Sequence, residues 1–373
     1  MKRIQEQYVI KDLSSKYVFL AGPRQSGKTT LAKQLFSSQD YQYLNYDLAE
    51  HRQIMVSGQW LREKKLIILD EFHKYPTWKT HLKGYYDTEG NTPSILVTGS
   101  ARLNVYRKGN DSMVGRYFYH RLMPFSVKEL EKQMPSQEAL EALLEYGNFP
   151  EPLLKASKQA LKRWQKQYLE RVIREDVTDL SNIRDLPKIQ LLIDVLRQRV
   201  GTTISYASIA RDLEIAPKTC KQWIELLEQL YIVFRITPYH KNIARSLLKE
   251  PKIYFYDATM AFDESAHLEN LVAVCLKKHL LFLEDTQGIE TNLHYLRTKD
   301  QKEIDFVTLQ DNKIEHMIEV KTSKDTYESA FSYFKKQITP HKCYQIVKNL
   351  KQPKTINDVN IIPAAQYLSR LSA

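Results

Sequence analysis

The sequence predicts an α/β protein of several domains, in which a parallel sheet with a phosphate-binding loop comes first and a smaller α/β domain comes last. Three observations support this fold class. An apolar run at 17–21 leads directly into the loop GPRQSGKTT. Apolar runs at 66–69 and 94–97 are short and end in polar residues, which is typical of buried parallel strands. Residues 303–321 read EIDFVTLQDNKIEHMIEVK, which indicates two strands joined by turn-forming residues.

The composition indicates a folded protein with an anionic partner. The 373 residues are enough for two or three domains, each with its own core. A formal net charge of +11 is consistent with binding to nucleic acid, although the basic residues are spread along the chain. The three cysteines lack metal-ligand spacing, which favours a reducing compartment over a zinc site or disulfides. Because no apolar run suits a signal peptide or a membrane span, we expect a cytoplasmic protein without a membrane partner.

The loop after the first strand matches the phosphate-binding pattern G-x-x-x-x-G-K-[ST], between a strand-like and a helix-like segment. Gly22 and Gly27 allow the backbone to wrap closely around phosphates, and Lys28 can reach the terminal phosphates. Thr29 can ligate Mg²⁺ through its hydroxyl. The sequence therefore predicts binding of ATP with Mg²⁺. The predicted nucleotide-binding residues are Gly22, Pro23, Arg24, Gln25, Ser26, Gly27, Lys28, Thr29 and Thr30.

Two later strands end in residues suited to ATP hydrolysis. The run at 66–69 is followed by Asp70, which would hold Mg²⁺ through water, and by Glu71, which would polarise the attacking water. The run at 94–97 ends in Thr-Gly-Ser, and we expect this strand to lie between the other two. Ser100 is our candidate for a side chain that senses the γ-phosphate. The alternative is a simple polar turn, because Ser and Thr are common turn formers.

These motifs, in this order, resemble a known family. GPRQSGKTT, LDEFHKYP and TGSARL, followed by GRYFYHRLMPFSVKEL and YGNFPEPLL, resemble the bacterial and archaeal family in which an AAA+ ATPase domain precedes the domain DUF4143. The resemblance covers nearly the whole chain. It implies that Arg116 is an arginine finger that acts on a neighbour's nucleotide, which would require a homo-oligomer. The alternative is an arginine that pairs with a local carboxylate.

Together, the patterns and the resemblance predict four domains. We expect the AAA+ P-loop core at 1–125, a helical lid or connector at 126–188, a winged helix-turn-helix at 189–257 and a nuclease-like domain at 258–373. In the connector, helical patterns flank an NFPEP turn, and Arg171 and Arg174 are candidates for a second nucleotide sensor.

The winged helix-turn-helix is predicted from the segment at 202–239, which reads as two helices followed by an apolar strand. Lys218, Lys221 and Gln222 would be exposed at the start of its second helix, where DNA readers contact bases and phosphates. Lys252 and three other basic residues beyond the wing could add phosphate contacts. The alternative is a winged helix that contacts protein.

The C-terminal residues suggest a metal-dependent nuclease. Glu269 lies in an apolar helical run, and strand alternation places Asp305, Glu319 and Lys321 on one face of the predicted hairpin. This order of residues resembles the PD-(D/E)xK nuclease fold. It implies that Glu269, Asp305 and Glu319, with the backbone oxygen of Val320, gather Mg²⁺ or Mn²⁺. Lys321 would then help to activate water.

The sequence therefore predicts an ATPase coupled to a metal-dependent nuclease that acts on nucleic acid, with DNA favoured over RNA. The alternative from a different class is a nucleotide-switched interaction module, in which the nuclease-like domain docks onto a partner without cleaving it. A third possibility is a motor that remodels proteins.

Overall fold

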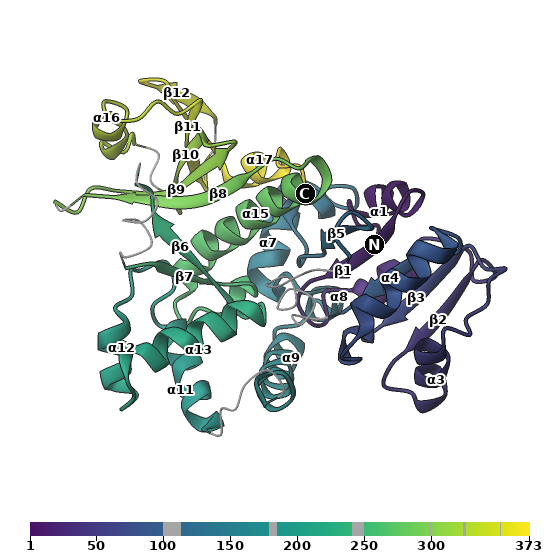
Figure 1. Ribbon diagram of the computed structural model, residues 1–373. Helices are drawn as coiled ribbons and strands as arrows, with labels where there is room; N and C mark the ends of the chain where they lie inside the picture. Colours follow the sequence, from purple (N-terminus) through teal and green to yellow (C-terminus); the bar gives the residue numbers. More distant parts are fainter. Residues whose placement is uncertain (100–112, 179–184, 241–249, 299, 324–325, 351) are drawn as a thin grey trace. The chain divides into compact units, whose positions relative to one another are not determined.

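The computed structural model describes residues 1–99, 113–178, 185–240, 250–298, 300–323, 326–350 and 352–373 (Figure 1). The chain divides into two compact units, which are considered separately. The first comprises Met1–Pro124 with Gln229–Tyr231, and the second comprises Phe125–Glu228 with Ile232–Ala373. The division into four domains is finer than this and stays a prediction.

A five-stranded parallel sheet forms the centre of the first unit. Its order is β2-β3-β4-β1-β5, and every neighbouring pair is parallel. The strands are β1 (Tyr17–Ala21), β2 (Tyr41–Asn45), β3 (Leu66–Asp70), β4 (Ser94–Thr98) and β5 (Tyr117–Arg121). β4 lies between β3 and β1, and Thr98 at its carboxyl end is opposite Asp70 of β3 and Leu20 of β1.

Helices cover both faces of this sheet and account for the continuous apolar runs. The helices are α1 (Glu6–Leu13), α2 (Lys28–Gln34), α3 (Ala49–Ser57) and α4 (Trp78–Glu89), with a short 3₁₀ helix, η1 (Phe72–Lys74). Val18 and Leu20 of β1 pack in one core cluster with residues of α1 and α2. Phe19 lies in a second cluster with residues of α3 and α4. Successive side chains of β1 therefore enter different cores, and the strand needs no polar face.

The second unit begins with helices. They are α6 (Val127–Leu130), α7 (Ser136–Tyr146), α8 (Pro150–Lys155), α9 (Lys158–Arg171), α11 (Leu186–Arg197), α12 (Tyr206–Asp212) and α13 (Pro217–Gln229). A π-helical turn, η2 (Val172–Val177), continues α9. The NFPEP segment is not only a turn: α8 begins at Pro150, because proline is tolerated in the first turn of a helix.

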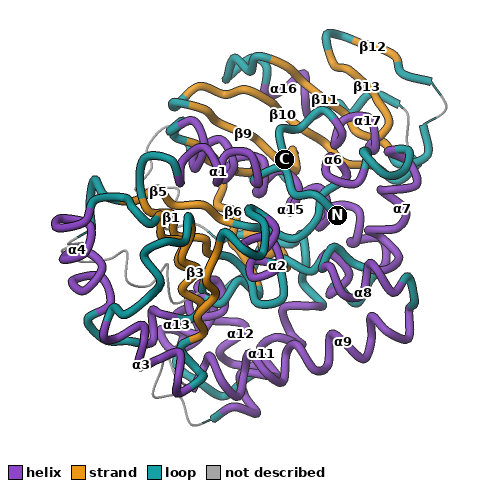
Figure 2. The backbone as a smooth tube through the Cα atoms, turned by 90° about the vertical axis from the view of Figure 1, so that its right-hand side faces the viewer, coloured by secondary structure: helices purple, strands orange, loops and turns teal. Residues whose placement is uncertain are grey.

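An eight-stranded mixed sheet completes the second unit, in the order β12-β13-β11-β10-β9-β8-β6-β7 (Figure 2). The strands are β6 (Val233–Pro238), β7 (Lys252–Phe255), β8 (Thr291–Arg297), β9 (Glu303–Gln310), β10 (Lys313–Lys321), β11 (Lys342–Val347), β12 (Lys354–Ile356) and β13 (Val359–Pro363). The remaining elements are η3 (Ala258–Met260), α15 (Glu264–Gln287), α16 (Ala330–Phe334) and α17 (Ala364–Ser369).

The predicted winged segment and the C-terminal strands share this sheet. The β6–β7 hairpin follows α12 and α13, as a winged helix requires, and β6 also pairs in parallel with β8. The predicted hairpin at 303–321 is formed by β9 and β10, with Ile318 opposite Phe306. Asp311 and Asn312 have positive φ, which suits the two-residue turns that join such strands. The long helix α15 packs against β7, β8 and β10.

None of the described helices combines the length and the apolar character that crossing a bilayer demands.

Two partly buried histidines should make the second unit less stable in mild acid. Burial lowers the pKa of both His279 and His316 to about 4. Because the unfolded chain takes up these protons near pH 6.5, their contribution is present above that pH and lost as pH falls towards 4. We expect each histidine to cost about 1–2 kcal/mol of unfolding free energy between pH 7 and pH 5.

Urea unfolding at pH 7 and pH 5 tests this expectation. His316→Gln should reduce the loss of stability, because the substituted side chain does not titrate. The exposed His341→Gln is the matched control. An equal pH dependence in the wild type and in His316→Gln would contradict the assignment.

Candidate functional site

The P-loop between β1 and α2 depends on backbone conformations that its glycines permit. Gly22 has a φ of 142°, and a Cβ at this position would lie 2.4 Å from the carbonyl oxygen of Leu122. Gly27 is left-handed, with a φ of 95°, and directly precedes the first residue of α2. Gln25 also has a positive φ. A side chain at Gly22 would therefore displace the segment that follows β5.

Lys28 begins α2, and its ammonium turns back onto the loop. Its Nζ donates hydrogen bonds to the carbonyl oxygens of Gly22 and Pro23, at 3.1 and 2.6 Å, and the residue is buried. Ser26 is fully buried, and its hydroxyl lacks a hydrogen-bond partner among the described residues. A buried cation and an unsatisfied hydroxyl in one loop fit the phosphates that the motif predicts.

Asp70, at the end of β3, accepts hydrogen bonds from three hydroxyls on three different elements. Thr29 of α2 and Tyr43 of β2 donate to its Oδ2, at 3.1 and 2.7 Å, and Thr98 of β4 donates to its Oδ1 at 2.5 Å. Parallel strands bring their carboxyl ends to the same edge of a sheet, which explains this convergence. Thr29 and Asp70, the predicted Mg²⁺ residues, are therefore in contact, and their oxygens suit this ion.

Glu71 has the backbone strain that often marks a functional position. Its φ is 59°, which is left-handed, and its backbone N–H donates to the carbonyl oxygen of Thr98. Oε2 of Glu71 lies 3.5 Å from Nζ of Lys74 and 3.6 Å from Nε2 of His73. Burial raises the pKa of the Glu71 carboxyl above its ordinary value, and the Lys74 ammonium partly offsets this effect.

Arg116 pairs with a carboxylate of its own chain. Its Nε donates to Oδ1 of Asp87 at 2.6 Å, which is the arrangement that the alternative interpretation describes. Arg116 precedes β5 and therefore lies at the amino edge of the parallel sheet, whereas the P-loop follows the carboxyl end of β1. A five-residue strand separates these edges by roughly 16 Å. Arg116 is therefore too far from its own P-loop to contribute there, and its role as a finger on a neighbour's nucleotide stays a prediction. Ser100 lies outside the described residues.

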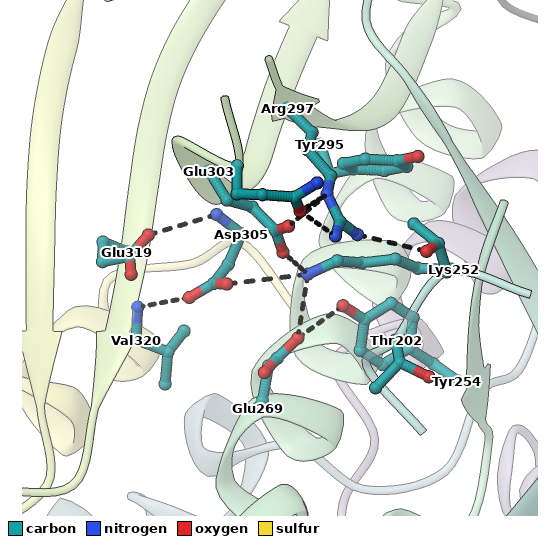
Figure 3. A network of polar contacts seen from close by, with 12 residues as sticks. Thr202, Lys252, Tyr254, Glu269, Tyr295, Arg297, Glu303, Asp305, Glu319 and Val320 are labelled. Atoms are coloured by element: carbon teal, nitrogen blue, oxygen red, sulfur yellow. Dashed lines mark hydrogen bonds and ion pairs between the residues drawn. The ribbon is translucent and has the colours of Figure 1, made fainter. Parts of the chain in front are cut away.

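A second polar cluster lies in the C-terminal sheet (Figure 3). The backbone N–H of Val320 donates to Oδ2 of Asp305 at 2.9 Å, and the backbone N–H of Asp305 donates to Oε2 of Glu319 at 3.3 Å. Lys321 Nζ donates to Oε1 of Glu319 at 2.6 Å. The structure thus brings Asp305, Glu319 and Lys321 together, as the alternation of β9 and β10 predicts.

Lys252, on β7, reaches the middle of this cluster (Figure 3). Its Nζ lies 2.5 Å from Oε1 of Glu303, 3.5 Å from Oε1 of Glu269 and 3.7 Å from Oδ1 of Asp305. The Lys252 side chain is only 2% exposed. Burial by itself would lower the pKa of Lys252, but the three carboxylates raise it above its ordinary value. The lysine is therefore charged at neutral pH.

The predicted metal ligands of the C-terminal domain do not form a metal site. Among the described residues, no group of three or more His, Cys, Asp or Glu side chains has the geometry to hold a metal ion. Glu269, Asp305 and Glu319 were expected to do so. Instead, Lys252 lies between Glu269 and Asp305, and the Glu319 oxygens accept from Lys321 and from the backbone. The arrangement therefore gives no support to Mg²⁺ or Mn²⁺ binding by these carboxylates, and that call stays a prediction.

Burial affects the protonation of the same carboxylates. It raises the pKa of Glu269 to about 7 and that of Glu319 to about 8, and in both cases the nearby Asp305 carboxylate contributes. The pKa of Asp305 is also raised by burial. Such carboxylates share too few cations to be fully ionised near neutral pH.

Sequence reasoning missed several residues of both sites. Tyr43 and Thr98 on Asp70 were not assigned, although Thr98 belongs to the motif that suggested Ser100. Lys252 was interpreted as a surface phosphate contact, which is wrong because it is buried. Alternation offered a signal, since Lys252 and Tyr254 share one face of β7, as Glu303 and Asp305 share one face of β9. The Tyr254 hydroxyl donates to Oε1 of Glu269 at 2.6 Å.

The predicted DNA-reading residues keep the exposure that was expected. Lys218, Lys221 and Gln222 are exposed near the start of α13. Arg171 and Arg174 pair with Glu175 and Glu170, respectively, on their own helical segment. The exposure is compatible with either DNA or protein contact.

Comparisons with known proteins agree with the motifs. A model described as an AAA domain matches residues 14–131, and models of two domains of unknown function, DUF8612 and DUF4143, match residues 137–263 and 264–367. An uncharacterized protein of Methanocaldococcus jannaschii is 24% identical over 348 residues, covering 84% of this chain and 76% of that protein. One of Mycobacterium tuberculosis is 24% identical over 299 residues, covering 77% of this chain and 66% of that protein.

Two solved structures resemble the chain at lower sequence identity than these relatives do. A Walker-type ATPase of Pyrococcus abyssi is 16% identical and has a TM-score of 0.42, covering 69% of this chain and 93% of that chain. A STAND protein with a tetratricopeptide repeat sensor from Pyrococcus horikoshii is 16% identical and has a TM-score of 0.28, covering 77% of this chain and 48% of that chain. The motifs, the parallel sheet and the matched family models lead to one architecture: the chain joins an AAA ATPase domain to a C-terminal DUF4143 domain.

Proposed function

We propose that the chain is a nucleotide switch, in which the first unit binds and hydrolyses ATP with Mg²⁺ and the second unit docks onto a partner without cleaving it. One observation carries the proposal. Carboxylates in the two units have different partners. Asp70 accepts hydrogen bonds from neutral hydroxyls, whereas Asp305 and Glu269 face the Lys252 ammonium. In the second arrangement, an ammonium already lies where a metal ion would face these oxygens.

The residues of the first unit have distinct roles in this proposal. Lys28 would leave its loop carbonyls to contact the terminal phosphates, and Thr29 and Asp70 would hold Mg²⁺. The bound ion would neutralise charge on the phosphate oxygens. Glu71 would accept a hydrogen bond from the attacking water and orient it. Its raised pKa favours proton acceptance, because a carboxylate with a higher pKa is a stronger base.

Docking is favoured over cleavage for the second unit. A nuclease of the predicted type needs carboxylates that are free to coordinate a divalent ion, together with a lysine near the scissile phosphate. Here Asp305 accepts from Val320, Glu319 accepts from Lys321, and Lys252 lies beside the remaining oxygens. These oxygens already have hydrogen-bond or ion-pair partners within the protein, which supports the interaction-module alternative.

Nucleic acid is the proposed partner, with DNA favoured over RNA. The net charge of +11 and the exposed Lys218, Lys221 and Gln222 on α13 support it. We also propose a homo-oligomer, because Arg116 is too far from its own P-loop to contribute to hydrolysis there. In the oligomer Arg116 would exchange Asp87 for a neighbour's γ-phosphate.

Two substitutions test the ATPase. Lys28→Ala should abolish ATP binding, and Glu71→Gln should retain binding but reduce turnover by about 100-fold or more, because the amide cannot accept the proton. Steady-state phosphate release and equilibrium binding of a fluorescent ATP analogue measure the two effects. Lys65→Ala, which removes an exposed lysine of the same unit, is the control. Wild-type turnover in both Lys28→Ala and Glu71→Gln would rule out the assignment.

Thr98 offers a finer test of the Asp70 network. Thr98→Val keeps the shape of the side chain but removes the hydrogen bond to Oδ1 of Asp70. We expect ATP binding to persist while turnover falls by about tenfold. A decrease of this size corresponds to the free energy of one lost hydrogen bond to a charged group. The dependence of turnover on Mg²⁺ concentration should shift upwards. Unchanged turnover and unchanged Mg²⁺ dependence would show that Thr98 does not position Asp70.

A cleavage panel separates docking from nuclease activity. Labelled single-stranded DNA, duplex DNA and RNA are incubated with Mg²⁺ or Mn²⁺, with and without ATP. We expect no cleavage by the wild type, but binding of at least one substrate. Lys321→Ala should behave in the same way. Cleavage that disappears in Lys321→Ala would establish a nuclease and refute docking as the sole role of the second unit.

A further inference from the structure

We propose that the C-terminal cluster is a latent metal site in which the Lys252 ammonium takes the place of a divalent cation, so that the carboxylates can bind a metal ion only when this lysine is removed. The inference rests on the proposed function in one respect, that the wild-type cluster holds no metal ion. It goes beyond that function because it assigns the cause to a single side chain and predicts a new ligand for its variants.

The geometry around Lys252 is that of a small cation site. Carboxylate oxygens from two elements, Glu303 and Asp305 on β9 and Glu269 on α15, lie within 3.7 Å of one nitrogen. An ammonium has three N–H donors, which matches three acceptors. Divalent ions also select carboxylate oxygens, but at 2.0–2.6 Å. The present distances of 2.5 to 3.7 Å suit nitrogen rather than a metal ion.

The surroundings hold the carboxylates in place without a metal ion. Tyr254 donates to the same oxygen of Glu269 that faces Lys252, and Val320 donates to the other oxygen of Asp305. The backbone of Gly201 lies so close to Glu269 that a Cβ there would be 2.8 Å from Oε1. These contacts keep the carboxylates near the position of the ammonium when it is removed, and the oxygens then need to move inward by about 1 Å to coordinate a metal ion.

Lys252 itself has no alternative position in solvent. It is 2% exposed and lies on a strand whose other residues are also buried. An unpaired buried ammonium would be very costly. Removing the lysine would take away the cation that Glu269, Glu303 and the buried Asp305 share, although Arg297 Nε would still lie 3.4 Å from Oε2 of Glu303. Removing the lysine should therefore create both a loss of stability and a demand for a replacement cation.

The test is thermal unfolding of the full chain without ATP, with and without Mn²⁺ or Mg²⁺. Lys252→Met removes the charge but keeps most of the length of the side chain. We expect it to lower Tm by roughly 10 °C, and we expect millimolar Mn²⁺ to recover most of that loss. Lys252→Arg keeps the charge and should not respond to Mn²⁺ more than the wild type does. The double variant Lys252→Met with Asp305→Asn should lose the recovery.

A second measurement does not require that Lys252→Met folds. Bound Mn²⁺ is counted by electron paramagnetic resonance in the wild type and in Asp305→Asn, both without ATP. Equal numbers in the two proteins support the inference, because the wild-type cluster then holds no metal ion. More Mn²⁺ bound by the wild type would overturn it, since a metal ion would then be present beside Lys252.

The outcomes also separate this inference from the proposed function. Absence of any Mn²⁺ effect on folded Lys252→Met would overturn the latent metal site but would leave docking and ATP hydrolysis intact. Metal-dependent cleavage by the wild type would instead refute docking, whatever the thermal shifts are. A gain of Mn²⁺ binding in Lys252→Met, with no cleavage by the wild type, supports both.

Discussion

The pairing of one buried ammonium with three carboxylates is the constraint on which the second unit depends. Lys252 connects β7 of the winged segment with β9 and α15 of the C-terminal segment. Neither side can lose its partner cheaply, because a buried charge without a counter-charge is strongly destabilising. The cluster therefore joins two stretches that are separate in the sequence. Both stretches also contribute strands to the same eight-stranded sheet.

The first unit handles a buried carboxylate in a different way. Asp70 is surrounded by hydroxyl donors from Thr29, Tyr43 and Thr98, which stabilise the carboxylate without cancelling its charge. Hydroxyls can rotate, and each can also accept a hydrogen bond. Such a site can exchange its internal hydrogen bonds for a hydrated metal ion. An ammonium that fills the cation position leaves no room for that exchange.

This contrast gives a physical reason for assigning ATP turnover to the first unit and partner binding to the second. The first unit has a strained glutamate, a cationic loop and an aspartate that can accept an ion, all of which suit turnover of a phosphate compound. The second unit has carboxylates that already face an ammonium, and it has an exposed helix with basic residues. A nucleotide-controlled first unit and a second unit that binds without reacting are consistent with both arrangements.

The sequence by itself determined the P-loop, the parallel strands and the β9–β10 hairpin, because motif spacing and alternation depend on neighbours along the chain. It also placed Asp305, Glu319 and Lys321 on one face correctly. Only the tertiary structure decided what those carboxylates contact. Lys252 is separated in the sequence from Glu269, Glu303 and Asp305 by other elements, and two strands lie between β7 and β9 in the sheet order, so its pairing depends on that order and on how β7 and α15 come to face β9. Neither periodicity nor spacing encodes that order, and the same carboxylates therefore read as metal ligands in the sequence but act as partners of an ammonium in the fold.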